Sequence, residues 1–295
     1  MKNYFCFILI IISFTTMYSQ EWIKVGENLN FPEGPAWDGK ESLYVSSCYG
    51  GFISIINSNG QTKFIDSTQQ PFKLKQTNGL TFYKDGFLYA CDYGIGAILK
   101  ISKDGNSEIF IPGYNGVKFN RPNDLAFDNK GNLYFTDPKS YDKNNLDGRV
   151  FKVNIKTKEV TIADSGIGFA NGIVFNEDFS KVFVCESALQ RILVYNVDEE
   201  GNFLNKKVFA ELPGGDPDGL AIDKEGNLYA AHFGGGNIVI FDPQGNVIKK
   251  IKTPGKKPSN VEFGENDLKT LFITEDETNC VYKMKVDVAG LNLLR

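Results

Sequence analysis

One pattern repeats six times along the chain at a spacing of 42 to 48 residues. In each repeat a short segment carries one Asn, Asp or Glu, and a strand-like pair such as Leu-Tyr follows ten or eleven residues later. The six residues are Glu33, Asn78, Asn123, Asn171, Asp218 and Asn260. A period in the forties, built from short β-strands, is typical of a propeller in which each repeat forms one blade. The sequence therefore predicts an all-β fold, a six-bladed β-propeller of four-stranded antiparallel blades.

The third repeat illustrates the expected blade. Its inner strand is predicted at 123–127, a turn at 128–132 and the second strand at 133–136. Two further strands are predicted at 149–155 and 159–163, because apolar and polar residues alternate there.

The sixth repeat supplies only three strand signals, at 260–263, 270–274 and 280–286. The segment 21–25, which precedes the first repeat, is predicted to add the missing outer strand. This arrangement closes the ring between the two termini and leaves no open sheet edge. Because no linker, charge block or low-complexity stretch interrupts the repeats, residues 21–295 are expected to form a single domain.

The first twenty residues do not belong to the repeat. Lys2 precedes an apolar run from Tyr4 to Phe14, and a stretch of small and polar residues follows at 15–20. This order predicts a secretory signal peptide at 1–20 and export to the periplasm or the exterior. A membrane anchor is the alternative, but the apolar run is short for a permanent span. We therefore expect no stable membrane insertion after the signal is cleaved.

Net charge and cysteine content limit the expected partners. A formal net charge of −4 argues against a phosphate-backbone partner, so we expect no nucleic acid, and we expect a monomer. Four cysteines remain after cleavage: Cys48, Cys91, Cys185 and Cys280. Export permits disulfides, and Cys48 with Cys91, in adjacent blades, is the pairing to test. Buried free thiols are the alternative that the sequence leaves open.

The six repeated residues form a predicted ring at one face of the propeller, because the first strand of every blade lines the central channel. Two carboxylates and four carboxamides offer oxygen ligands alone, which suits Ca²⁺ with its 6 to 8 oxygens. Zinc is disfavoured, because the chain has a single histidine, His232. Asn or Asp before Gly is also a common turn element. Six such residues in register favour a site, although the turn and ligand roles can coexist.

A second repeated position lies near the end of each predicted second strand. Its members are Ser47, Asp92, Asp137, Glu186, His232 and Glu275. Such residues can orient ligands of a metal, bind substrate, or satisfy backbone donors between blades. We favour a structural or ligand-orienting role for the four acids. His232 is different, since the only imidazole of the chain at this position could contact substrate.

The chemistry that these residues allow is metal-assisted hydrolysis. A bound cation polarises a carbonyl or phosphoryl oxygen, and Asp218 or Glu33 beside it can act as base or nucleophile. Arg121 lies two residues before Asn123 and is therefore expected at the same end of the central channel, where it can bind hydroxyls or an anion. A serine esterase has little support, because the sequence lacks the Gly-x-Ser-x-Gly elbow.

Four segments resemble the signature segments of the gluconolactonase and regucalcin (senescence marker protein) family. They are Phe31-Pro32-Glu33-Gly34-Pro35-Ala36-Trp37, Arg121-Pro122-Asn123-Asp124-Leu125, Ala170-Asn171-Gly172-Ile173 and Pro217-Asp218-Gly219-Leu220-Ala221-Ile222-Asp223. That family comprises six-bladed, calcium-dependent lactonases and is akin to diisopropyl fluorophosphatase and the paraoxonases. The resemblance spans nearly all of the chain after the predicted signal.

The resemblance implies a role for individual residues. Glu33, Asn171 and Asp218 match the calcium ligands of the family, and Asn123 matches an Asn that ligates in some members. Asp218 also matches the catalytic base, and Arg121 matches an Arg that contacts substrate in the animal enzymes. Those enzymes carry a sugar-contacting Glu where this chain has Tyr141, so the resemblance does not identify the sugar.

We therefore expect an exported, calcium-dependent hydrolase that opens a sugar lactone. The expected metal ligands are Glu33, Asn123, Asn171 and Asp218, with another divalent ion as an alternative to Ca²⁺. Asp218 is the expected base, and the expected substrate contacts are Arg121, Asn78 and His232. If Asn78 does not contact substrate, it is expected to be only a neighbour of the metal site. Asn260 is expected to be a neighbour of that site or a turn residue. The alternative functions are a phosphotriesterase or aryl-ester hydrolase on the same site, and a non-enzymatic binding propeller stiffened by calcium.

Overall fold

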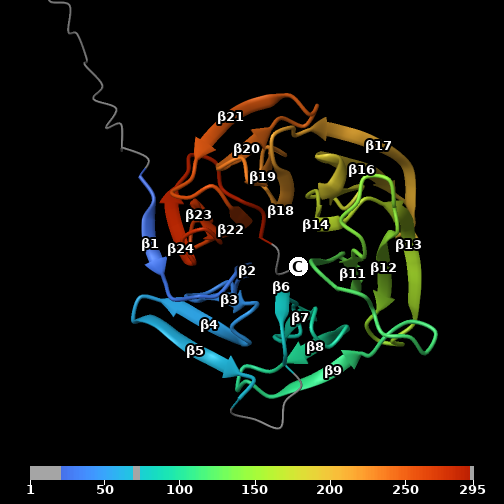
Figure 1. Ribbon diagram of the computed structural model, residues 1–295, viewed down its shortest axis with the longest axis horizontal. Helices are drawn as coiled ribbons and strands as arrows, with labels where there is room; N and C mark the ends of the chain where they lie inside the picture. The colour runs from blue at the N-terminus through green and yellow to red at the C-terminus, as the bar shows by residue number, and fades with distance from the viewer. Residues whose placement is uncertain (1–20, 69–73, 293–295) are drawn as a thin grey trace, which may run out of the picture.

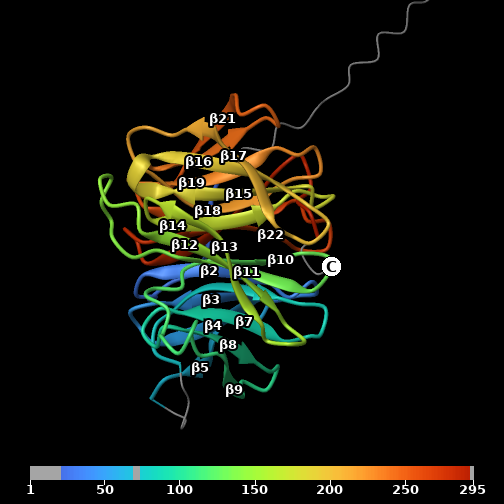
Figure 2. The ribbon, with the colours of Figure 1, turned by 90° about the vertical axis from the view of Figure 1, so that its right-hand side faces the viewer.

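The computed structural model describes residues 21–68 and 74–292, which fold into six four-stranded antiparallel sheets around one axis (Figure 1). Within each sheet the strands follow one another in chain order from the axis outward, apart from the sheet that holds β1. The side view in Figure 2 shows the ring from its edge. The predicted six-bladed propeller is confirmed.

The strands of the first three blades correspond to the first three repeats. Blade one contains β2 (Pro32–Trp37), β3 (Leu43–Ser47), β4 (Phe52–Asn57) and β5 (Gly60–Asp66). Blade two contains β6 (Thr77–Phe82), β7 (Leu88–Asp92), β8 (Ala97–Ile101) and β9 (Ser107–Ile111). Blade three contains β10 (Leu125–Phe127), β11 (Asn132–Asp137), β12 (Gly148–Asn154) and β13 (Val160–Ile167).

The remaining blades follow the same plan. Blade four contains β14 (Ala170–Phe175), β15 (Lys181–Glu186), β16 (Arg191–Val197) and β17 (Phe203–Glu211), with the short 3₁₀ helix η1 (Ser187–Leu189) after β15. Blade five contains β18 (Asp216–Ile222), β19 (Leu228–Phe233), β20 (Asn237–Phe241) and β21 (Val247–Lys252). Blade six contains β22 (Pro258–Gly264), β23 (Thr270–Glu275), β24 (Cys280–Lys285) and β1 (Ile23–Gly26).

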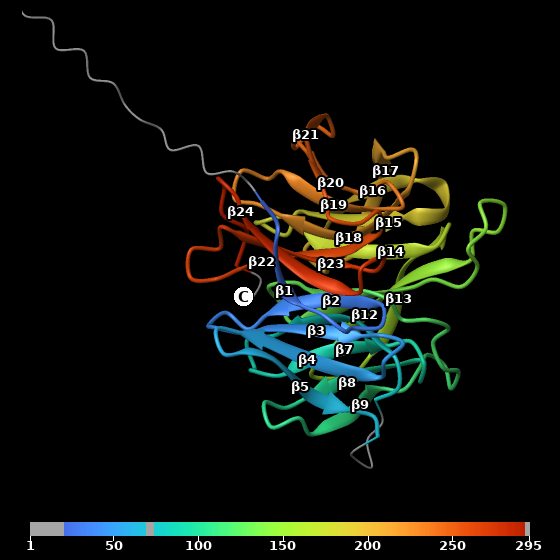
Figure 3. The same cartoon turned by 60° about the vertical axis from the view of Figure 1, so that its left-hand side comes forward.

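The N-terminal strand closes the ring. β1 pairs antiparallel with β24, with Ile23 opposite Lys283 and Gly26 opposite Val281 (Figure 3). Blade six therefore takes its outer strand from the start of the chain, as predicted. The first and last blades are joined by main-chain hydrogen bonds rather than by loop contacts alone.

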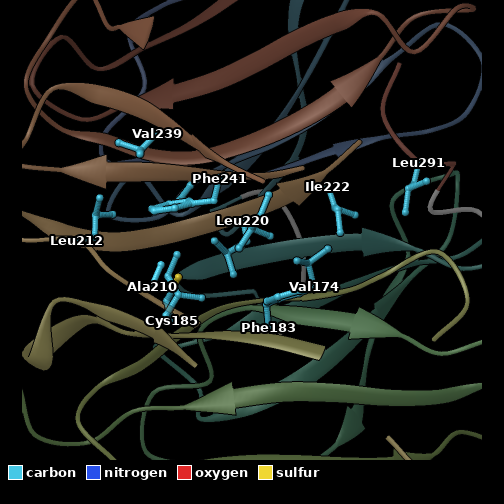
Figure 4. Close-up of a cluster of buried hydrophobic side chains, with 13 residues drawn as sticks. Val174, Phe183, Cys185, Ala210, Leu212, Leu220, Ile222, Val239, Phe241 and Leu291 are labelled. Atoms are coloured by element: carbon cyan, nitrogen blue, oxygen red, sulfur yellow. The ribbon is translucent and has the colours of Figure 1, made fainter. Parts of the chain in front are cut away.

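The hydrophobic core lies between neighbouring blades. Figure 4 shows one cluster, in which Phe183 and Cys185 of blade four face Leu220 and Phe241 of blade five. Leu291 joins the same cluster, and its backbone N–H donates to the Ile222 carbonyl oxygen at 3.1 Å. The C-terminal segment thus packs over the ends of β18 and β22 that lie opposite the predicted ring of polar residues.

The starts of four inner strands are irregular in a way that positions the site. The pairing of β2, β6, β14 and β18 with the second strand of its blade shifts register across the ring residue and the glycine after it. A β-bulge of this kind turns a side chain away from the regular alternation. Apart from Asn123, which precedes β10, the ring residues are parts of strands, and the Asn-Gly and Asp-Gly pairs are not turns.

Close packing at the axis explains the glycines. A Cβ on Gly79 would lie 2.6 Å from the Asn123 carbonyl oxygen, and a Cβ on Gly172 would lie 2.2 Å from the Asp218 carbonyl oxygen. Both distances are too short for any larger residue. The repeated glycine lets neighbouring inner strands approach each other, which brings their polar side chains together.

The remaining sequence predictions concern the cysteines and the N-terminal segment. Cys48, Cys91, Cys185 and Cys280 are buried free thiols, so the possible Cys48–Cys91 disulfide is not formed. The predicted signal peptide lies outside the described residues. No helix within 21–68 and 74–292 has the length and apolar character needed to cross a membrane.

Candidate active site

A pocket of about 210 Å³ opens at the axis, where the inner strands begin. Five of the six ring residues line it: Glu33, Asn78, Asn123, Asn171 and Asp218. All five are buried, with at most 9% of each residue exposed. Arg121 lines the same pocket. The structure thus brings together six of the seven residues predicted for the site.

Hydrogen bonds hold two of the predicted ligands in place. Asn171 donates from Nδ2 to Ser187 Oγ at 3.2 Å, and Ser187 Oγ donates to the Pro217 carbonyl oxygen at 2.7 Å. Ser187 also lines the pocket and lies in η1. The start of blade five, which carries Asp218, is therefore tied to Asn171 of blade four.

His232 is the predicted site residue that the structure places elsewhere. It is buried, but it does not line the pocket; its neighbour Phe233 does. Successive side chains of a strand point to opposite faces, so the face of β19 that gives Phe233 to the pocket turns His232 away. The imidazole packs against Gly215 and Gly235, and burial lowers its pKa.

Asn260 is also absent from the pocket lining. Its Oδ1 accepts a hydrogen bond of 2.8 Å from the Val261 backbone N–H, and it lines a separate cavity farther along the axis together with Asp124. This position agrees with its predicted role as a neighbour of the metal site.

The electrostatics of the pocket favour a cation. Burial, followed by the charge of Asp124, raises the pKa of Glu33 to about 8. Burial and then Glu33 raise the pKa of Asp218 well above its usual range. None of the ion pairs formed by the described residues includes either carboxylate. Two buried carboxylates without a counter-charge are unfavourable unless protons or a cation neutralise them.

The donor set fits a hard cation. The pocket offers carboxylate and carboxamide oxygens, which are the ligands that Ca²⁺ takes. Cys48 reaches the pocket as well, but burial raises the pKa of its thiol far above neutrality, so it stays protonated. Among the described residues no group of three or more His, Cys, Asp or Glu is close enough to hold a metal. The further protein oxygens that the pocket offers beside Glu33 and Asp218 are the side-chain amides of Asn78, Asn123 and Asn171.

Asp276 is a residue of this region that the sequence analysis missed. Neither of its carboxylate oxygens has a hydrogen-bond partner among the described residues, although both atoms are buried. Burial, followed by the charge of Glu33, raises its pKa to about 9. Ser259, in the neighbouring strand, has its hydroxyl oxygen 2.7 Å from the Pro32 carbonyl oxygen and so links blade six to the residue before Glu33. The only signal in the sequence was its place directly after the repeated acid Glu275.

Aromatic rings form the mouth of the pocket, which the sequence analysis also missed. The rings belong to Phe31, Tyr49, Tyr93, Tyr141, Phe169 and Phe233. The Arg121 guanidinium lies 5.3 Å from the centre of the Tyr93 ring. Because these residues come from connections between strands or from strand ends, the strand repeat does not predict them.

The second repeated position has the structural role that we favoured. Asp92 accepts the backbone N–H of Lys75 at 2.6 Å, and Glu275 accepts that of Lys257 at 2.7 Å. Glu186 and Asp137 do the same for the segments that precede β14 and β10. In blade three the donor is the backbone N–H of Arg121, at 2.8 Å from Asp137 Oδ1. This acid therefore also positions a residue of the pocket.

The fold and the pocket define a class of protein, a six-bladed propeller with a pocket of oxygen ligands on its axis. Residues 31–276 match the family model described as the SMP-30/Gluconolactonase/LRE-like region. The chain belongs to this family, and the predicted resemblance is confirmed.

Two relatives show the breadth of the family. The gluconolactonase of Zymomonas mobilis subsp. mobilis is 32% identical over 275 residues, which cover 86% of this chain and 74% of that protein. The diisopropyl-fluorophosphatase of Loligo vulgaris is 30% identical over 215 residues, which cover 67% of this chain and 68% of that protein.

Two solved structures share the fold. A gluconolactonase from Xanthomonas campestris gives a TM-score of 0.79 at 24% identity and covers 90% of this chain and 89% of its own. Regucalcin from Agrobacterium tumefaciens, described as a calcium-binding protein, gives a TM-score of 0.74 at 18% identity and covers 90% of this chain and 93% of its own. At such identities the likeness establishes the fold alone.

Proposed function

We propose that this protein is a calcium-dependent hydrolase that opens the ring of a lactone, with a sugar lactone as the leading candidate. One observation carries the proposal: Glu33 and Asp218 lie buried and uncompensated in a pocket of amide oxygens. The relative named gluconolactonase supports the choice of a lactone. The neighbour described as calcium-binding supports the choice of Ca²⁺.

The residues that would hold the ion are Glu33, Asn123, Asn171 and Asp218. When bound, Ca²⁺ supplies a Lewis acid that polarises the lactone carbonyl. All four side chains come from the starts of inner strands or the residues just before them. Three lie at β-bulges, and the backbone N–H of Asn123 donates to the Thr136 carbonyl oxygen at 2.9 Å, so pairing within the blades and not flexible loops fixes their positions.

Asp218 is the proposed base. It would take a proton from the attacking water as the water oxygen bonds to the carbonyl carbon. The bond between that carbon and the ring oxygen then breaks, and the proton passes to the leaving oxygen to give a hydroxy acid. Arg121 is placed to bind hydroxyls of the substrate or the carboxylate of the product. The aromatic mouth packs on the ring faces of the substrate and excludes bulk water from the pocket.

The proposal is tested by following acid release from a panel of small lactones at constant pH. The panel is run with chelator and then with Ca²⁺, Mg²⁺, Mn²⁺ or Zn²⁺ restored. Asp218→Asn should lower kcat by roughly 10²- to 10⁴-fold, with Ca²⁺ binding measured in parallel. Near-normal hydrolysis by a variant that still binds Ca²⁺ would show that Asp218 is not the base. Asp267→Asn, which removes an exposed acid of blade six outside the pocket, is the control and should keep its activity.

A phosphotriesterase or aryl-ester hydrolase is the second candidate. The aromatic mouth favours a substrate with an apolar group, and the Loligo vulgaris relative is named a diisopropyl-fluorophosphatase. Adding a fluorophosphate and an aryl ester to the panel separates the two activities, because the better substrate has the higher kcat/KM. Stabilisation by Ca²⁺ without any hydrolysis would instead favour a binding propeller.

We also propose that the protein is exported, as residues 1–20 predict. The N-terminal sequence of the mature protein tests this, and an intact Met1 would contradict it.

A further inference from the structure

Two asparagines from neighbouring blades flank Glu33. Asn78 belongs to blade two and Asn260 to blade six, and hydrogen bonding by the side chain of each lowers the pKa of the Glu33 carboxyl group. They are equally buried, with 6% of Asn78 and 7% of Asn260 exposed. Because these contacts lower the pKa, they favour the ionised carboxylate, which only accepts hydrogen bonds, so each asparagine turns its NH₂ group toward Glu33. The Oδ1 atom of each then needs a partner of its own.

The two Oδ1 atoms differ in whether they have that partner. Asn260 Oδ1 accepts the backbone N–H of Val261 at 2.8 Å. For Asn78 the corresponding N–H belongs to Gly79, and it donates to the Asn123 carbonyl oxygen at 2.7 Å instead. Within residues 21–68 and 74–292, Asn78 Oδ1 has no hydrogen-bond partner, although the atom is buried.

An unpaired buried amide oxygen is unfavourable, and native structures rarely leave one without a reason. The location of Asn78 supplies the reason here. It lines the pocket that contains Glu33, Asn123, Asn171 and Asp218, whereas Asn260 does not. The pocket holds two carboxylates without a counter-charge, and a carboxamide oxygen is a ligand that Ca²⁺ prefers.

We propose that Asn78 is a ligand of the bound cation through its Oδ1 atom. Blade two then joins blades one, three, four and five in the cation site, and Asn78 is not a contact for substrate hydroxyls. The inference rests on the cation of the proposed function, and it separates two residues that stand at equivalent positions of the sequence repeat.

The test compares Asn78→Ala with Asn260→Ala in the full-length protein without substrate. Ca²⁺ affinity is measured by calorimetry, and the number of water molecules on bound Tb³⁺ is obtained from luminescence lifetimes in H₂O and D₂O. Asn78→Ala should weaken Ca²⁺ binding by about 10-fold or more and add one water molecule to Tb³⁺. Asn260→Ala also removes a hydrogen bond to Glu33 but no ligand, so it should leave the water number unchanged and weaken Ca²⁺ binding less than Asn78→Ala does. Melting curves in chelator show whether both variants fold.

An unchanged affinity and water number in folded Asn78→Ala would overturn the inference and leave the proposed hydrolase standing; a raised KM in that variant would assign Asn78 to substrate. If wild type binds no cation, both the inference and the calcium dependence fail. If wild type binds Ca²⁺ through Asn78 but hydrolyses nothing on the panel, only the proposed function fails.

Should Asn78→Ala not fold, Asn78→Asp keeps the oxygen, adds charge and should bind Ca²⁺ more tightly than wild type. An equal or weaker affinity of Asn78→Asp would overturn the inference.

Discussion

Tyr141 donates a hydrogen bond of 2.7 Å from its hydroxyl to Asp216 Oδ2, a residue 75 positions later in the chain. Tyr141 lies in the connection between β11 and β12 of blade three, and Asp216 begins β18 of blade five. The Tyr141 ring also packs against Phe169, which precedes blade four, at 5.3 Å between ring centres. All three residues line the pocket. The connection therefore links three blades across the wall of the site.

Removing this hydroxyl should loosen the pocket without unfolding the protein. Tyr141→Phe keeps the ring against Phe169 but breaks the bond to Asp216, and Tyr141 is 57% exposed. A hydrogen bond to a charged group at such a position contributes about 1 kcal/mol, so KM should rise roughly fivefold with little change in Tm. Steady-state kinetics on the best lactone measure this, with Tyr49→Phe at the same mouth as control. An unchanged KM would show that the link does not shape the pocket.

A second prediction concerns the unpaired carboxylate of Asp276. Because its pKa is raised to about 9, the metal-free protein must hold this carboxyl group protonated at neutral pH, which costs stability; its ionised form would attract the cation. Asp276→Asn should therefore raise Tm in chelator and weaken Ca²⁺ binding by roughly 10-fold, as measured by calorimetry. The control is Asp267→Asn, which removes an exposed acid of the same blade that pairs with Lys285 and should leave Ca²⁺ affinity unchanged. If Asp276→Asn changes neither Tm nor affinity, the carboxylate does not act on the site.

The stability of the metal-free protein should fall as pH rises from about 5 to 9. The pKa of Glu33 is raised to about 8 and that of Asp276 to about 9 in the folded protein, against about 4 for carboxyl groups in an unfolded chain. Between those values the folded state binds more protons than the unfolded state, so deprotonation disfavours folding. Asp66 and Glu265, whose pKa values are lowered to about 2, act in the opposite sense but below this window.

The measurement is Tm across pH 5 to 9, once in chelator and once in Ca²⁺. The increase in Tm caused by Ca²⁺ should grow with pH, because the ion competes with protons for the same carboxylates. The Glu33→Gln variant should lose most of this growth. A pH-independent increase would mean that the raised pKa values do not belong to groups that contact the ion.

The fold could be predicted from the sequence because each blade is a local unit. The repeats, turns and alternating strands lie within about 45 residues of one another, and a count of strand signals was enough to assign residues 21–25 to the last blade. Most of the ring could also be predicted from the sequence, because Glu33, Asn123, Asn171 and Asp218 occupy equivalent positions in the repeat.

The rest depends on contacts between blades, which a repeat does not encode. Asn78 and Asn260 look equivalent in sequence, but the backbone N–H that follows each has a different acceptor. The N–H after Asn78 donates to a carbonyl oxygen of blade three, whereas the N–H after Asn260 donates to the Asn260 side chain. His232 seemed a candidate because it is the only imidazole, but the alternation of β19 turns it from the pocket. Tyr141 lies on an irregular connection whose path no periodicity determines.

The closure of the ring yields the final prediction. Deleting residues 21–26 removes the strand that pairs with β24 and exposes an unpaired sheet edge. It also removes Val25, which packs against the buried cluster that contains Leu43, Phe272 and Val281. The chain should lose roughly 3 kcal/mol of stability, a drop in Tm of roughly 6 to 12 °C, and should tend to aggregate. Calorimetry and light scattering measure both effects. The control is a chain that starts at residue 21, and an equal Tm for the two would show that β1 is not needed to hold the first and last blades together.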